Sequence, residues 1–122
     1  MKYKAFRMPL YMTKIHVCTL DFPTEKLKID PKSICHDTNM ALGDCQECKN
    51  KDTGSEAVLI RLPNQYKADH VWHESMHAAA FVLKIMGIPF DADNMDVLIY
   101  PTEVIHGLIK QRFYKLPVDF LS

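Results

Sequence analysis

Alternating apolar and polar positions predict strands at the start of the chain. Every second residue from Ile15 to Thr19 is β-branched, and the residues between are His16 and Cys18. Such alternation suits a strand buried mainly on one face. Pro9 is expected to separate two short strands within residues 2–20, because proline has no N–H to donate to a sheet.

The middle of the chain alternates between polar and apolar stretches. Residues 21–32 contain two prolines and predict a turn, a short helix capped by Thr24 and a loop. Residues 34–56 are mostly polar, and the apolar run Ala57–Leu62 that follows has the length and composition of a strand. The polar insertion 34–56 is therefore expected to be a hairpin or decorated loop that leads into this strand.

Helical periodicity begins after that strand. Between Val71 and Met86 most apolar residues recur at three- and four-residue steps, and Gly87 supplies a left-handed end with Pro89 beyond it. Asn64 and Asp69 are both candidate caps. The apolar residues expected to face inward are Val71, Trp72, Met76, Ala79, Ala80, Leu83 and Met86.

A second helix is predicted from about Asp93. Its inward residues would include Val97, Leu98, Ile105 and Leu108, while Pro101 must kink the helix or split it. The order of strands, polar insertion, strand and two helices predicts an α+β fold in which a small antiparallel or mixed sheet packs on both helices. We expect one domain over residues 1–122, a length sufficient for one hydrophobic core.

Charge and cysteine content narrow the classes of function. Lys and Arg total 15, as do Asp and Glu, so the chain lacks the positive field of nucleic-acid or anionic-membrane binders. Basic residues scattered through residues 1–20 argue against a signal peptide, and no apolar run is long enough to span a bilayer. We therefore expect a cytoplasmic protein, and in a reducing compartment its four cysteines would be thiols or metal ligands rather than disulfides.

The predicted first helix carries the motif His73-Glu74-Ser75-Met76-His77. Histidines four residues apart share one helix face, so both imidazoles can bind one zinc ion. Glu74 lies about 100° around the helix from His73, where it can take a proton from a zinc-bound water. This H-E-x-x-H pattern predicts a zinc-dependent hydrolase with His73 and His77 as ligands and Glu74 as general base.

A catalytic zinc needs a third protein ligand. The spacing with a histidine six residues after the second is excluded, since Leu83 occupies that position. The second helix offers Asp96, which we prefer, and Glu103 as the alternative. Asp96 could instead be a first-turn carboxylate that interacts with the helix dipole.

The motif, the Met86-Gly87-Ile88 helix end and the segment Asp96–Tyr100 resemble small gluzincin-like metallopeptidases, many of them encoded by bacteriophages. This group shows strands, H-E-x-x-H, then a glutamate followed four residues later by tyrosine. The resemblance implies a minimal zincin-like fold, a peptide or protein substrate, and Asp96 as third ligand. The chain departs from the group by having aspartate there and Pro101 after the tyrosine. Tyr100 is a candidate donor to a ligand or the oxyanion, or else a core aromatic. If the protein is viral, the host cytoplasm is its expected location.

The cysteines suggest a second metal site. Cys45 and Cys48 form a C-x-x-C pair, and Cys35 with His36 precedes it by ten residues, which could give a structural zinc site. A redox-sensitive pair and ordinary loop cysteines are the alternatives. His16, His70 and His106 are expected to be surface or hydrogen-bonded residues rather than ligands.

The predicted substrate cleft lies between the strand Ala57–Leu62 and the first helix, where an edge strand would hold an extended peptide. The alternative function is a non-catalytic interaction protein that keeps zinc for stability. The intact Glu74 favours the hydrolase.

Overall fold

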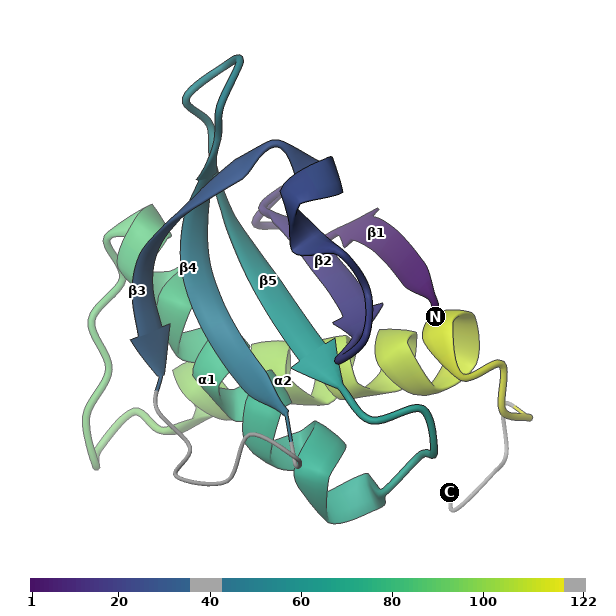
Figure 1. Ribbon diagram of the computed structural model, residues 1–122. Coiled ribbons are helices and arrows are strands. Elements are labelled where there is room, and N and C mark those ends of the chain that lie inside the picture. Colours follow the sequence, from purple (N-terminus) through teal and green to yellow (C-terminus); the bar gives the residue numbers. More distant parts are fainter. Residues whose placement is uncertain (36–42, 118–122) are drawn as a thin grey trace.

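Five strands form one mixed sheet in the computed structural model of the chain, in the order β1-β2-β5-β4-β3 (Figure 1). The structure describes residues 1–35 and 43–117, and of residues 31–35 it describes only the backbone. The sheet and two helices confirm the predicted α+β class with a mixed sheet.

The centre of the sheet is a parallel pair. β1 (Tyr3–Arg7) runs antiparallel to β2 (Lys14–Thr19), and β2 runs parallel to β5 (Glu56–Leu62). The expected separation of two strands around Pro9 is thus confirmed. Because β5 lies between β2 and β4, both of its edges are hydrogen-bonded.

The described part of the polar insertion is mostly strand. β4 (Asp44–Asn50) leads into β5, as expected of this segment, and it pairs antiparallel with β5 on one side and with β3 (Ile29–Cys35) on the other. The expected loop before residue 32 is wrong in part, because β3 begins at Ile29 directly after a short 3₁₀ helix, η1 (Thr24–Leu27). Pro23, not Thr24, precedes the first helical residue, and it provides no side-chain cap.

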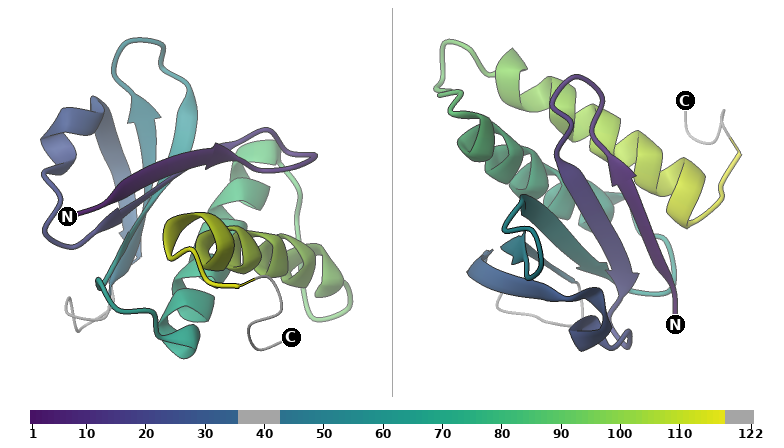
Figure 2. Two further views of the ribbon diagram at one scale, coloured as in Figure 1. Left: turned by 90° about the vertical axis from the view of Figure 1, so that its right-hand side faces the viewer. Right: turned by 90° about the horizontal axis from the view of Figure 1, so that it is seen from above.

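Both helices cover the same face of the sheet (Figure 2). α1 (Ala68–Met86) ends where Gly87 takes φ 72°, and the Gly87 and Ile88 N–H groups bond to carbonyls of the last turn, as its glycine predicted. Lys67 is the N-cap and makes no side-chain capping hydrogen bond, so neither predicted residue, Asn64 or Asp69, is the N-cap. Neither helix is long and apolar enough to cross a bilayer, judged over the ranges that the structure describes.

α2 (Asp96–Leu108) continues through Pro101 rather than splitting, and it passes into a π-helical turn, η3 (Ile109–Phe113). Pro101 is buried, and the Thr102 hydroxyl donates to the Leu98 carbonyl at 2.7 Å. α2 returns alongside α1, so the pair forms one layer over the sheet (Figures 1 and 2).

Two apolar clusters hold these layers together. The larger cluster lies between the sheet and the helices, and includes Ile15, Val58, Ile60, Val82 and Ile105. A smaller one on the opposite face joins Cys18, Cys48 and Leu59 under Phe22 and Leu27 of the η1 region. Packing in the larger cluster therefore fixes the orientation of α1, the helix that carries the H-E-x-x-H motif.

Candidate metal centre

His73 and His77 lie side by side in the first half of α1. Their Nε2 atoms are 3.2 Å apart, and their ring centroids are 4.8 Å apart with an interplanar angle of 69°. His73 is exposed and His77 is half-buried, so the pair is open to solvent on one side. This is the arrangement expected for residues four apart in a helix.

The separation of the two nitrogens fits a shared zinc ion. Zn–N bonds of about 2.0–2.1 Å at a tetrahedral angle require nitrogens about 3.3–3.4 Å apart. The observed 3.2 Å therefore needs only a small adjustment of either side chain. Without metal, the same distance allows one Nε2–H to donate to the other Nε2.

Glu74 lies on the inner face of α1. Its side chain is 1% exposed, and Ser75 beside it is fully buried. Both residues share this face with Ala78, Ala79 and Val82. Burial of a carboxylate is costly, so a glutamate beside two solvent-facing histidines is typical of a functional position rather than of ordinary packing.

The apolar stripe of α1 is rotated from its predicted position. Met76 and Met86 were expected inside but are 37% and 46% exposed, whereas Glu74, Ser75 and Phe81 are buried. The small side chains at 75, 78 and 79 allow the helix to approach the sheet closely, and this brings Glu74 inside. Apolar periodicity alone could not show that two polar residues occupy the core face.

An aromatic cluster flanks the motif. The Tyr66 hydroxyl and His106 Nε2 are 3.0 Å apart, and the rings of Trp72 and His106 meet edge to face at 5.6 Å. Burial, with a smaller contribution from Lys110, lowers the pKa of His106. His106 is thus a hydrogen-bonded residue, as expected, and so is His16, whose Nδ1 is 2.7 Å from the Tyr3 hydroxyl. The sequence did not single out Tyr66, whose position before α1 gave no periodic signal.

Among the described residues, neither Asp96 nor Glu103 joins the two histidines in a group of three possible metal ligands. Asp96 is the first residue of α2, ten residues before His106, which is about 15 Å along a helix axis. The ring of His106 contacts the ring of Trp72, the residue next to His73. Glu103 is exposed and lines a shallow cavity with Gly107 and Gln111. Within residues 1–35 and 43–117, no three His, Cys, Asp or Glu side chains form a group that could hold a metal ion.

The structure removes one alternative for Tyr100 and one for the cysteines. Tyr100 is 45% exposed on α2, so it is not a core aromatic. Cys45 belongs to the cluster under the helices and Cys48 to the cluster on the opposite face. Residues three apart in a strand point to opposite sides, so these two thiols do not share one ion. The side chain of Cys35 and all of His36 lie outside the described residues.

The predicted substrate cleft is filled. β5 is central, so it offers no free edge for an added peptide strand, and its inner residues Val58, Ile60 and Leu62 are fully enclosed beneath the helices. The outermost strands of the described sheet are β1 and β3. A bound substrate would therefore approach the histidines from the outer side of α1.

Two imidazoles at the right separation and a buried carboxylate in the same helical turn are groups that can bind a divalent metal and accept a proton. The described residues bring two imidazole nitrogens together at this place and no third side chain of a metal-ligating type. Comparison with protein-family models, curated proteins and solved structures finds no match to this chain.

Proposed function

We propose that this protein is a zinc-dependent hydrolase that cleaves a peptide or amide bond, with His73 and His77 as metal ligands and Glu74 as general base. The observation that carries the proposal is the 3.2 Å separation of the two Nε2 atoms, close to what tetrahedral zinc requires. The H-E-x-x-H pattern supports it, because the glutamate falls between the ligands in sequence and beside them on the helix.

When bound, zinc lowers the pKa of a water to about 7 and polarises the substrate carbonyl. His73 and His77 would hold the ion on the outer side of α1, where solvent reaches the two side chains. The Glu74 carboxylate accepts a proton from the attacking water and passes it to the leaving amine.

Metal content tests the ligand assignment. We expect one zinc per parent chain by elemental analysis, and none in His77→Ala. His70→Ala is the matched control, since His70 lies in the same helix one turn before His73 and should leave zinc content unchanged. Asp96→Ala and Glu103→Ala test the sequence prediction for the third ligand, and both should retain zinc, because neither carboxylate joins the two histidines among the described residues.

Hydrolysis of a quenched fluorescent peptide library tests the general base. Glu74→Gln should keep its zinc and lose activity by at least about a hundredfold, within the usual contribution of a general base. A folded parent protein free of zinc after growth and purification with zinc would overturn the proposal. Equal activity of Glu74→Gln and the parent would remove Glu74 from the mechanism.

One observation favours a second candidate function, a zinc-stabilised interaction protein. The described residues assemble two ligands rather than three, and the inner face of α1 is packed closely around Glu74. In that case the parent protein binds zinc and gains thermal stability from it, but no peptide in the library is cleaved. The two experiments together separate the candidates.

A further inference from the structure

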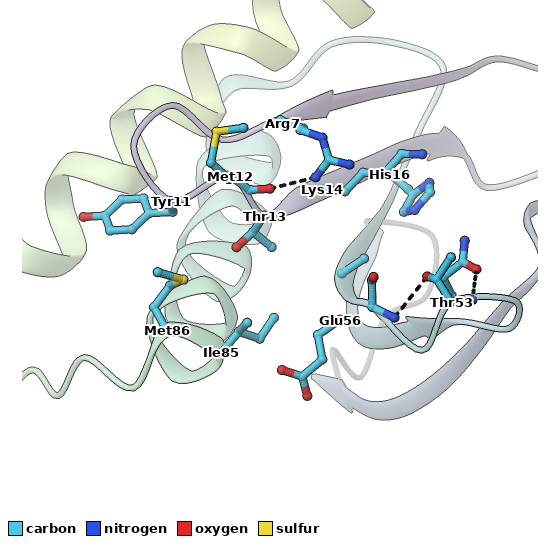
Figure 3. Close-up of a pocket in the computed structure, with 13 residues that line it drawn as sticks. Arg7, Tyr11, Met12, Thr13, Lys14, His16, Thr53, Glu56, Ile85 and Met86 are labelled. Atoms are coloured by element: carbon cyan, nitrogen blue, oxygen red, sulfur yellow. Dashed lines mark hydrogen bonds between the residues drawn. The ribbon is translucent and has the colours of Figure 1, made fainter.

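A cavity of about 560 Å³ lies at the end of the sheet where β2 and β5 begin (Figure 3). Its walls are the β1–β2 turn (residues 8–13), the β4–β5 turn (residues 51–55) and the last turn of α1. His77 and Met86 are nine residues apart, about 14 Å along α1, so this cavity is separate from the candidate metal centre. Its volume is within the range of small-molecule sites.

Two cations line the cavity on neighbouring strands. Arg7 and Lys14 are direct cross-strand partners of β1 and β2. In the part of the chain that the structure describes, neither side chain forms an ion pair. Like charges opposite one another destabilise a sheet, and a bound anion would relieve this repulsion. Glu56 is the carboxylate that also lines the cavity, so the lining is positive on balance.

His16 adds a neutral donor. Its side chain lines the cavity and is 4% exposed, and its Nδ1 lies 2.7 Å from the Tyr3 hydroxyl. Burial and the nearby Lys14 lower the pKa of His16 to about 4, and burial raises the pKa of Tyr3. A protonated phenol that donates to Nδ1 leaves the proton of the neutral imidazole on Nε2. Nε2–H is then the ring donor available to a ligand.

Hydrogen bonds hold Arg7 and the β4–β5 turn in place. Arg7 Nη1 donates to the Met12 carbonyl at 2.9 Å, which holds the guanidinium against the turn (Figure 3). On the facing turn, Asn50 Oδ1 accepts hydrogen bonds from the N–H groups of Asp52 and Thr53 at 2.8 and 3.0 Å. Groups that are ordered before binding lose little entropy when a ligand arrives.

The other side of the cavity is apolar. Tyr11, Ile85 and Met86 line it, and Met86 is 46% exposed. Figure 3 shows these three side chains together, on the side away from His16 and Thr53. A ligand that spans the cavity would therefore meet cations and donors at one end and an apolar surface at the other.

We propose that this cavity binds a small organic anion, with its carboxylate, sulfonate or phosphate group between Arg7 and Lys14 and its apolar body against Tyr11, Ile85 and Met86. The site is independent of the candidate metal centre and of its proposed hydrolase activity. The shared chemistry of its ligands is one anionic group attached to an apolar body of a few carbon atoms or a ring.

Fluorescence titration with 8-anilinonaphthalene-1-sulfonate tests this proposal, because the probe carries one anionic group on an apolar body. N-phenyl-1-naphthylamine is the uncharged control with nearly the same apolar body. We expect the parent protein to bind the sulfonate at least about tenfold more tightly than the uncharged probe, a difference that one to two ion contacts can supply. Inorganic phosphate should compete with the sulfonate, and added salt should weaken it.

The variants Arg7→Gln and Lys14→Gln should each reduce this preference, and the double variant should abolish it. Lys49→Gln is the matched control, because Lys49 is an exposed lysine of β4 outside the cavity. Thermal melting of each variant verifies that it is folded, and Met86→Ala tests the apolar end without changing any charge. Equal binding of the two probes, no binding at millimolar probe, or an effect of Lys49→Gln as large as that of Lys14→Gln would overturn the proposal.

Discussion

At the scale of residues, charged side chains in this fold differ widely in their contribution to the free energy of unfolding. Arg61 Nε lies 2.9 and 3.0 Å from the two carboxylate oxygens of Asp44, and Arg61 Nη2 also bonds to this carboxylate. The Asp44 side chain is 3% exposed, and the bond raises the pKa of Arg61. The pair ties β4 to β5 at the positions directly opposite one another.

We expect Asp44→Ala to lower the free energy of unfolding by about 2–4 kcal/mol, because it leaves a partly buried guanidinium without its partner. Urea denaturation measures the change. Asp30→Ala is the control, since Asp30 and Lys51 are 3.8 Å apart and both mostly exposed, and such pairs contribute less than about 1 kcal/mol. Losses of equal size in the two variants would contradict this explanation.

The motif histidines show how far residue patterns can predict a site. A spacing of four in a helix places two side chains together whatever the rest of the fold does, so the His73–His77 pair was predictable. The third ligand was not, because it depends on how α2 lies along α1. Asp96 is a chemically suitable residue at the far end of its helix from His106, the residue that contacts Trp72.

At the scale of elements, two glycines occupy different positions: one ends a helix and the other lies inside one. Gly87 has φ 72° at the end of α1, while Gly107 is inside α2. A Cβ added at either position meets no atom within 4 Å. The two positions therefore differ in backbone conformation alone.

Gly87→Ala should cost about 1 kcal/mol, because alanine is strained in the left-handed conformation. Gly107→Ala should instead stabilise by about 0.5–1 kcal/mol, because alanine has the higher helix propensity. Thermal unfolding of the two variants compares them directly. A loss of stability in Gly107→Ala as large as in Gly87→Ala would show that something other than backbone conformation controls these positions.

Most elements were predictable because their signals are local. Strand alternation, the apolar run before the motif and the Gly87 stop identified β2, β5 and α1 within a few residues. The error at β3 arose because Pro31 favours a loop locally, whereas pairing with β4 holds this segment in the sheet and a register shift follows the proline. The position of β5 at the centre of the sheet could not be predicted either, because strand order depends on contacts between segments distant in the sequence.

At the scale of the whole molecule, neutral histidines connect stability to pH. The pKa of His16 falls from 6.5 to about 4 on folding, chiefly through burial, and that of His106 falls as well. Between these pKa values the unfolded chain binds more protons than the folded one. Stability contributed by neutral His16 is therefore complete above about pH 6.5 and is lost as the pH falls toward 4.

We expect the free energy of unfolding to fall by on the order of 2–3 kcal/mol between pH 7 and pH 4 because of His16. Urea titrations across this range measure the slope. His16→Gln should flatten it, while His70→Gln, a change of the histidine near the start of α1, should not. A His16→Gln protein with the slope of the parent would assign the pH dependence to other groups.

The parallel pairing of β2 with β5 has a consequence for synthesis on the ribosome. Lys14 lies opposite Ala57 and Thr19 opposite Leu62, so β2 is synthesised well before β5, the strand with which it pairs. Until residue 62 has emerged, the β1–β2 hairpin has only its own hydrogen bonds and no helix over its apolar face. Two-stranded hairpins are only marginally stable in water, so the nascent N-terminal segment should stay unfolded or bound to a chaperone until β5 is made. Pairing of β2 with β5 closes the long loop between them, and we expect this step to limit the folding rate.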